Sequence, residues 1–92
     1  MTADRAETIA LTAFAWLLAQ DELRGVFLGA TGASPEDLRA AASDPATLTG
    51  VLDFLAMNDA WLIDFCRDEG VGPEEPMTAR AVLAGPAETH WT

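Results

Sequence analysis

Apolar residues recur along this chain at helical spacing. Over residues 4–19 they lie three, four and seven positions apart, which is the repeat that gathers side chains on one face of an α-helix. Two such sets occur side by side: Ile9, Ala13, Trp16 and Leu17, and then Leu11, Phe14 and Leu18. Together they cover more than half of the helix circumference, so we expect this helix to be the central one, surrounded by the others.

Capping residues, prolines and glycines divide the rest of the chain into further helices. Ser34-Pro35 and Asp44-Pro45 each place an N-cap residue before a proline at the first helical position. Asp37, three residues after Ser34, completes a variant capping box. Gly32 and Gly70 are suited to the left-handed residue that ends a helix. The predicted helices cover residues 4–19, 22–30, 35–42, 45–57, 60–69 and 73–84.

Two helix starts and the fold class complete the structural prediction. Asp21 is expected to be the N-cap of the second helix, and Pro73 is expected to open the sixth, with Pro76 tolerated in its first turn. No alternating apolar run flanks a hairpin turn. The fold class is therefore predicted to be all-α, a compact irregular or orthogonal bundle of five to six short helices. It forms a single helical domain over residues 1–85, followed by a flexible tail at 86–92.

The charge balance is strongly acidic. The 92 residues include 15 Asp and Glu against five Arg and no Lys, and the formal net charge is −10. Such a surface repels phosphate backbones and anionic lipid headgroups, so we expect neither a nucleic acid nor a membrane as partner. The apolar run from Ile9 to Ala19 is also shorter than the ~20 residues that cross a bilayer. With no signal-peptide pattern and a single cysteine, a cytoplasmic location is expected.

Residues able to carry out chemistry are few and scattered. Cys66 stands on an apolar helix face and the one histidine, His90, lies near the C-terminus, so no nucleophile–base pair is expected. Asp64, Asp68 and Glu69 lie close together on one helix, but without a histidine they indicate a solvated acidic face rather than a metal site. We therefore expect no enzyme, no cofactor, and no catalytic, cofactor-binding or metal-binding residues.

Aromatic side chains give the strongest functional signal in the sequence. Phe54 and Trp61 lie off the main apolar stripes of their helices, so either is a candidate for surface exposure. An exposed apolar patch on an acidic domain indicates a surface for a partner or for self-association. Trp91, in the tail, is a further docking candidate. Asp53, between Leu52 and Phe54, is expected to point away from the apolar stripe into solvent.

Several short strings are similar to those of a known family. They are Phe27-Leu28, Thr31-Gly32, Asp44-Pro45 and Val51-Leu52-Asp53-Phe54-Leu55. With its Ala/Leu-rich first helix, acidic-aromatic fifth helix and proline-containing last helix, the chain over about residues 6–84 resembles a family of short alphaproteobacterial proteins catalogued only as a domain of unknown function. The resemblance implies a stand-alone domain, and it supplies no catalytic, cofactor-binding or partner-binding residues.

These observations favour a non-enzymatic, acidic protein–protein interaction module, for which a second copy of the chain is one conceivable partner. Two alternatives stay open. The first is a small-ligand or lipid-binding helical domain with a pocket between its helices. The second is a nucleic-acid-associated protein with a helix-turn-helix-like pair, which the negative charge disfavours.

Overall fold

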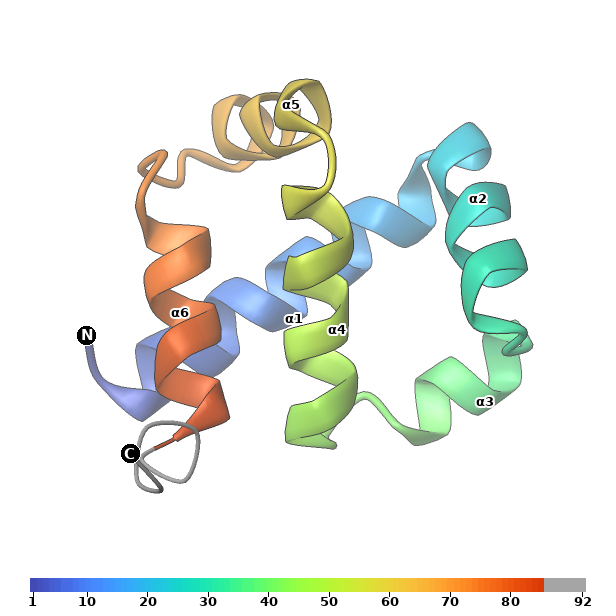
Figure 1. Cartoon of the computed structure of the whole chain (residues 1–92), viewed down its shortest axis with the longest axis horizontal. Coiled ribbons are helices and arrows are strands. Elements are labelled where there is room, and N and C mark those ends of the chain that lie inside the picture. The colour runs from blue at the N-terminus through green and yellow to red at the C-terminus, as the bar shows by residue number, and fades with distance from the viewer. Residues whose placement is uncertain (86–92) are drawn as a thin grey trace.

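Six α-helices account for most of residues 1–85, the part of the chain that the computed structural model describes (Figure 1). They are α1 Ala3–Ala19, α2 Asp21–Thr31, α3 Pro35–Ala40, α4 Pro45–Ala56, α5 Asp59–Glu69 and α6 Glu75–Ala84. Within this range no residue belongs to a strand. The predicted all-α class and irregular helical bundle are confirmed. No helix in the same range is long and apolar enough to cross a membrane.

The predicted capping signals define several helix ends. The Ser34 hydroxyl oxygen accepts from the Asp37 backbone N–H at 3.1 Å, and the Asp37 carboxylate accepts from the Ser34 N–H at 3.2 Å. This reciprocal pair is the predicted capping box at the start of α3. Gly32 and Gly70 follow α2 and α5 with φ of 71° and 66°. A residue with a Cβ is strained in that conformation, which explains why glycine stands at both stops.

Four predicted helix starts differ from the structure: α1, α2 and α5 begin one residue earlier than predicted, and α6 begins two residues later. α2 begins at Asp21 itself, and the single residue between α1 and α2, Gln20, occupies the N-cap position without a side-chain hydrogen bond. α6 begins at Glu75 rather than Pro73. The Gly72 N–H donates to the Glu75 carboxylate at 2.9 Å, while the Glu75 N–H donates to the Gly72 carbonyl at 3.0 Å. This closed turn keeps residues 72–74 outside the helix. Pro76, rather than Pro73, is the proline in the first turn of α6.

α1 is the element against which the others are assembled. In Figure 1 it crosses behind α4 and α6, which run side by side in front of it, while α5 lies across the top and α2 and α3 lie on the right. α1 packs most extensively against α6 and also contacts α2, α4 and α5. Ala6, Ala10 and Ala13 on its inner face are fully buried. Such small side chains let neighbouring helices approach closely.

The largest buried side chains come from α1 and α4, with single contributions from α5 and α6. Those that expose almost no surface are Ile9, Leu17, Leu48, Val51, Leu52, Leu55, Phe65 and Pro76. No polar or charged side chain among the described residues is buried. The core is therefore purely apolar, and burial of apolar area is its source of stability.

The inner face of α1 provides a direct test of this packing. Ala10 is fully buried, and Ala10→Leu adds volume to a site that is already packed. It is therefore expected to lower the free energy of unfolding by about 1–3 kcal/mol. Ala15→Leu makes the same change on the exposed side of α1, and it is expected to stay within about 0.5 kcal/mol of the parent. Urea unfolding followed by circular dichroism measures both. Equal losses for the two variants would contradict the packing described.

Candidate functional site

A cleft opens where the end of α1, the start of α2 and the outer part of α5 meet. Its volume is about 510 Å³. The apolar part of its lining consists of Trp16, Leu23, Val26 and Trp61. The polar part consists of Gln20, Asp21, Glu22, Asp64, Arg67 and Asp68. We call this surface the acidic cleft, because four carboxylates and one guanidinium leave it a formal excess of three negative charges.

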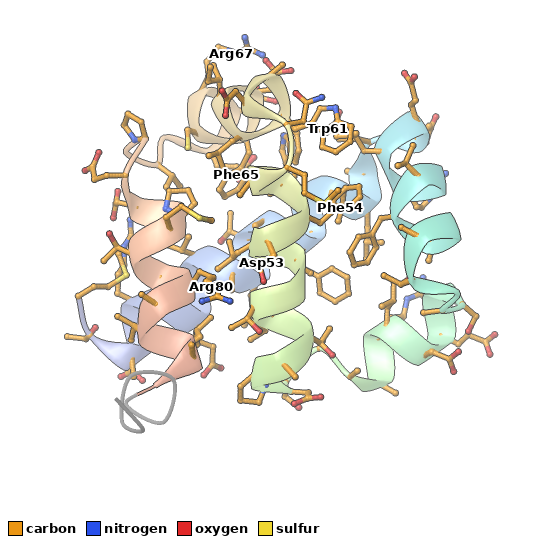
Figure 2. All side chains as sticks on the ribbon, viewed as in Figure 1. Asp53, Phe54, Trp61, Phe65, Arg67 and Arg80 are labelled. Atoms are coloured by element: carbon orange, nitrogen blue, oxygen red, sulfur yellow. The ribbon has the colours of Figure 1, made fainter. Side chains whose placement is uncertain are left out.

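The aromatic wall of the acidic cleft is held from behind by the core. The Trp61 ring stacks on Phe54, with ring centroids 5.0 Å apart and an interplanar angle of 19°. Phe54 in turn meets Phe27 edge to face at 5.0 Å. Figure 2 shows Phe54 and Trp61 on the side of α4 that faces α2. One face of Trp61 is thus fixed by packing, while the half-buried residue also lines the cleft.

The burial of Phe54 answers a question that the sequence left open. Phe54 is only 7% exposed, whereas Trp61 is half-buried. The reason is that the Phe27 ring of α2 and the Trp61 ring of α5 pack on Phe54, so a residue off the main stripe of α4 still enters the core. Trp91 lies outside the described residues. The most exposed large apolar side chains are instead Met57 and Ile63, which the stripes did not single out.

Trp16, which lines the acidic cleft, joins α1 to α5. Its ring meets Phe65 edge to face at 5.7 Å. Its indole Nε1–H donates to the Asp68 carboxylate at 2.9 Å, a charge-assisted hydrogen bond that fixes both side chains. This contact was not predicted, because 52 positions separate the two residues. No local pattern reports such a pairing.

Arginines bridge some of the acids around the acidic cleft. Arg67 lies 3.0 Å from the Asp64 carboxylate and 3.5 Å from that of Asp68. These bridges are exposed to solvent, so each contributes little stability. The predicted cluster of Asp64, Asp68 and Glu69 therefore forms a surface that Arg67 partly neutralises. Within residues 1–85, no three His, Cys, Asp or Glu side chains are placed to hold a metal ion.

Cys66 lies in the core beneath the link between α5 and α6. It is 8% exposed, and its thiol donates to the Gly72 carbonyl with 3.7 Å between Sγ and oxygen. Burial raises the pKa of the Cys66 thiol, and the nearby carboxylates of Glu74 and Glu75 raise it further. The thiolate is the reactive form, so this environment disfavours nucleophilic chemistry. His90, with which Cys66 was not expected to pair, lies outside the described residues.

Glu75 is a structural carboxylate in the same region. The Gly72 N–H and then the Arg5 guanidinium lower the pKa of the Glu75 carboxyl. The Arg5–Glu75 ion pair, with 3.2 Å between Nη2 and Oε2, links the first turns of α1 and α6. Both partners help position the helix ends, and neither lines the acidic cleft.

Asp53 points into solvent as predicted and also makes a contact that the sequence did not indicate. Its carboxylate oxygens lie 3.0 Å from Nε and 3.5 Å from Nη2 of Arg80. Figure 2 shows this two-pronged pair between α4 and α6. Such a fork matches the guanidinium to the carboxylate and orients the two helices. Asp53 therefore has a structural partner and lies outside the acidic cleft.

The comparisons with known proteins give a family without a described activity. A family model with the description "Protein of unknown function (DUF3572)" matches residues 3–86, which confirms the resemblance to a family of unknown function. No curated protein and no solved structure matches the chain. The family description names no ligand, partner or catalytic residue.

The buried thiol yields a test of the chemistry described for Cys66. Because burial and two carboxylates raise the pKa of the thiol, it is expected to react with an aromatic disulfide reagent at pH 8 roughly tenfold or more slowly in the folded protein than after unfolding in urea. Cys66 is the only cysteine of the chain, so the signal has one source. A native rate equal to that of the unfolded chain would contradict this account.

Proposed function

Since the chain belongs to DUF3572, a family described as of unknown function, we propose its function from the acidic cleft. The protein is a non-enzymatic interaction module that binds a basic segment of a partner protein between α1, α2 and α5. The observation that carries this proposal is the combination of an aromatic wall with a rim of carboxylates in one open cleft. Lys and Arg side chains have a charged head and an apolar stem, and both parts find a complement there.

Trp61, the half-buried tryptophan of the acidic cleft, supports a cationic ligand in particular, whereas Trp16 is only 7% exposed and offers little ring surface. A guanidinium or ammonium over the face of a tryptophan ring is attracted by the ring quadrupole. Trp61 is held in place by Phe54, and Trp16 is held by Phe65 and Asp68. Because these rings are already ordered by the core, a ligand would not have to immobilise them. The surrounding carboxylates would raise the local concentration of basic ligands.

A protein partner accounts for these features better than the alternatives considered from the sequence. The net charge of −10 opposes approach to nucleic acid. A lipid or apolar small molecule prefers a mostly apolar pocket that encloses it, whereas the acidic cleft is open to solvent and carries five charged side chains. An enzymatic role is disfavoured by the buried thiol and by the ion pairs of Asp64 and Asp68. A reducing, cytoplasmic setting suits the lone cysteine.

The proposal can be tested by selecting peptide ligands from a random peptide library on immobilised protein. We expect the selected peptides to be enriched in Lys and Arg next to apolar residues. The double variant Glu22→Gln, Asp68→Asn should weaken their binding by about tenfold, measured by fluorescence anisotropy. Asparagine at 68 retains an oxygen acceptor for the Trp16 indole, so the fold contact is preserved.

The matched control is the double variant Asp4→Asn, Glu36→Gln. It also changes the formal net charge from −10 to −8, but neither residue lines the acidic cleft. Its binding should stay close to that of the parent. Selection without basic enrichment, or equal losses in both double variants, would refute a specific role of the acidic cleft.

A further inference from the structure

The outer face of α1 is exposed to solvent and carries no charge. Residues 8–20 contain no Asp, Glu, Lys or Arg, although 22% of the chain is charged. Four of these residues are nevertheless exposed, namely Thr8, Leu11, Ala15 and Ala19. Solvent-facing helix surfaces ordinarily carry charged and polar side chains. In this range the exposed surface of α1 thus lacks the charged side chains that such surfaces ordinarily carry.

The two threonines on this surface are less polar than their type suggests. The Thr8 hydroxyl donates to the Asp4 carbonyl at 2.9 Å, and the Thr12 hydroxyl donates to the Thr8 carbonyl at 2.7 Å. Both donors are therefore committed to the backbone of α1 itself. The exposed stripe offers mainly methyl groups and the Leu11 side chain to whatever covers it.

This stripe forms one wall of a groove that adjoins the acidic cleft. The groove has a volume of about 630 Å³. It is lined by Leu11, Thr12, Ala15, Trp16, Ala19, Gln20, Asp68 and Glu69, and we call it the α1 groove. Trp16, Gln20 and Asp68 line both hollows. The hydrogen-bonded pair Trp16 and Asp68 is therefore shared by the two surfaces.

We propose that the partner segment binds as a basic amphipathic helix whose apolar side lies in the α1 groove and whose basic residues reach the acidic cleft. This inference rests on the proposed function and adds the conformation and register of the ligand. From Leu11 to Ala19 the stripe spans about 12 Å, or two helical turns. Alanines at 15 and 19 permit two helix axes to approach within about 8–10 Å. An apolar stripe of this kind is what a helix-in-groove ligand covers.

A helix suits this surface better than an extended peptide. A ligand that binds as a β-strand gains its affinity by pairing with the edge of a sheet, and residues 1–85 contain no strand. A helix satisfies its own backbone hydrogen bonds, so it needs only side-chain contacts from the groove. The α1 groove offers such contacts, because its alanines are apolar and the hydroxyls of Thr8 and Thr12 already donate to backbone carbonyls of α1.

The charges beside the groove indicate a basic partner rather than a second copy of the chain. Asp68 and Glu69 line the groove itself, and Asp21, Glu22 and Asp64 continue the acidic rim into the adjoining cleft. A second copy of the chain also has a formal net charge of −10, and like charges oppose association. A helix with Lys or Arg on both sides of an apolar stripe complements the rim.

The test uses two synthetic peptides of about 18 residues, long enough to form a helix. Both contain the same leucines and lysines. In the first, leucines recur at helical spacing; in the second, the residues are reordered so that leucines share no helical face. We expect the first peptide to bind and Ala15→Lys to weaken its binding by about tenfold. Fluorescence anisotropy measures both affinities.

Ala81→Lys is the matched control for the protein. Ala81 is an exposed alanine on α6, so the variant adds the same side chain and the same charge away from the groove. It should bind the first peptide within about twofold of the parent. In addition, amide chemical shifts of residues on the outer face of α1 should change on binding, and those of α6 should not.

Each other outcome overturns the inference in a recognisable way. Equal binding of both peptides, or binding weakened by Glu22→Gln, Asp68→Asn but not by Ala15→Lys, would exclude a helix in the α1 groove while leaving the proposed function intact. No binding of either peptide would count against both proposals. A dimer in sedimentation that Ala15→Lys dissociates would show that a second copy covers the groove.

Discussion

Ala6, Ala10 and Ala13 expose no surface to solvent, and the burial of this face of α1 against α4 and α6 is the interaction on which the rest of the structure depends. A chain of 92 residues has room for one core, so that core has to be dense. Small residues on α1 allow neighbouring helices to pack close to its axis, while the larger side chains of α4 fill the remaining space. The Asp53–Arg80 and Arg5–Glu75 pairs then orient α6 from outside the core.

The absence of buried polar groups among the described residues explains how the chain accommodates its charge. Every described acid remains in contact with solvent, so none bears the cost of an unpaired buried carboxylate. The charge instead produces a surface potential that favours cationic ligands. The two sides of α1 differ in role: its inner face is part of the core, and its exposed outer face carries no charged side chain over residues 8–19. The acidic cleft and the α1 groove meet on that outer side.

Sequence reasoning succeeded where the structure is determined locally. The capping box of Ser34 and Asp37 was predictable because each residue lies within one turn of the other. The stops at Gly32 and Gly70 were predictable because a positive φ favours glycine. At α6 a competing local signal misled the prediction, since the Glu75 side chain closes a turn that keeps Pro73 outside the helix.

The residue types of the candidate site could be predicted, but the contacts between them could not. Acidic and aromatic residues were identified, but the pairing of Trp16 with Asp68 depends on the packing of α5 against α1. The burial of Phe54 likewise depends on which helices cover α4. Periodicity describes one helix at a time and contains no information about its neighbours. The charge-free outer face of α1 could be interpreted only after the inner face had been identified.

Native-state hydrogen exchange tests the central role of α1 most directly. If the buried face of α1 organises the core, the amides of α1 and α4 should be the most protected and should exchange only through global unfolding. The amides of α3, in which Leu38 is buried while residues 36, 37, 39 and 40 are exposed, should exchange fastest among those of the helices. Exchange of α1 amides through local opening, while α2 and α3 remain protected, would contradict the account.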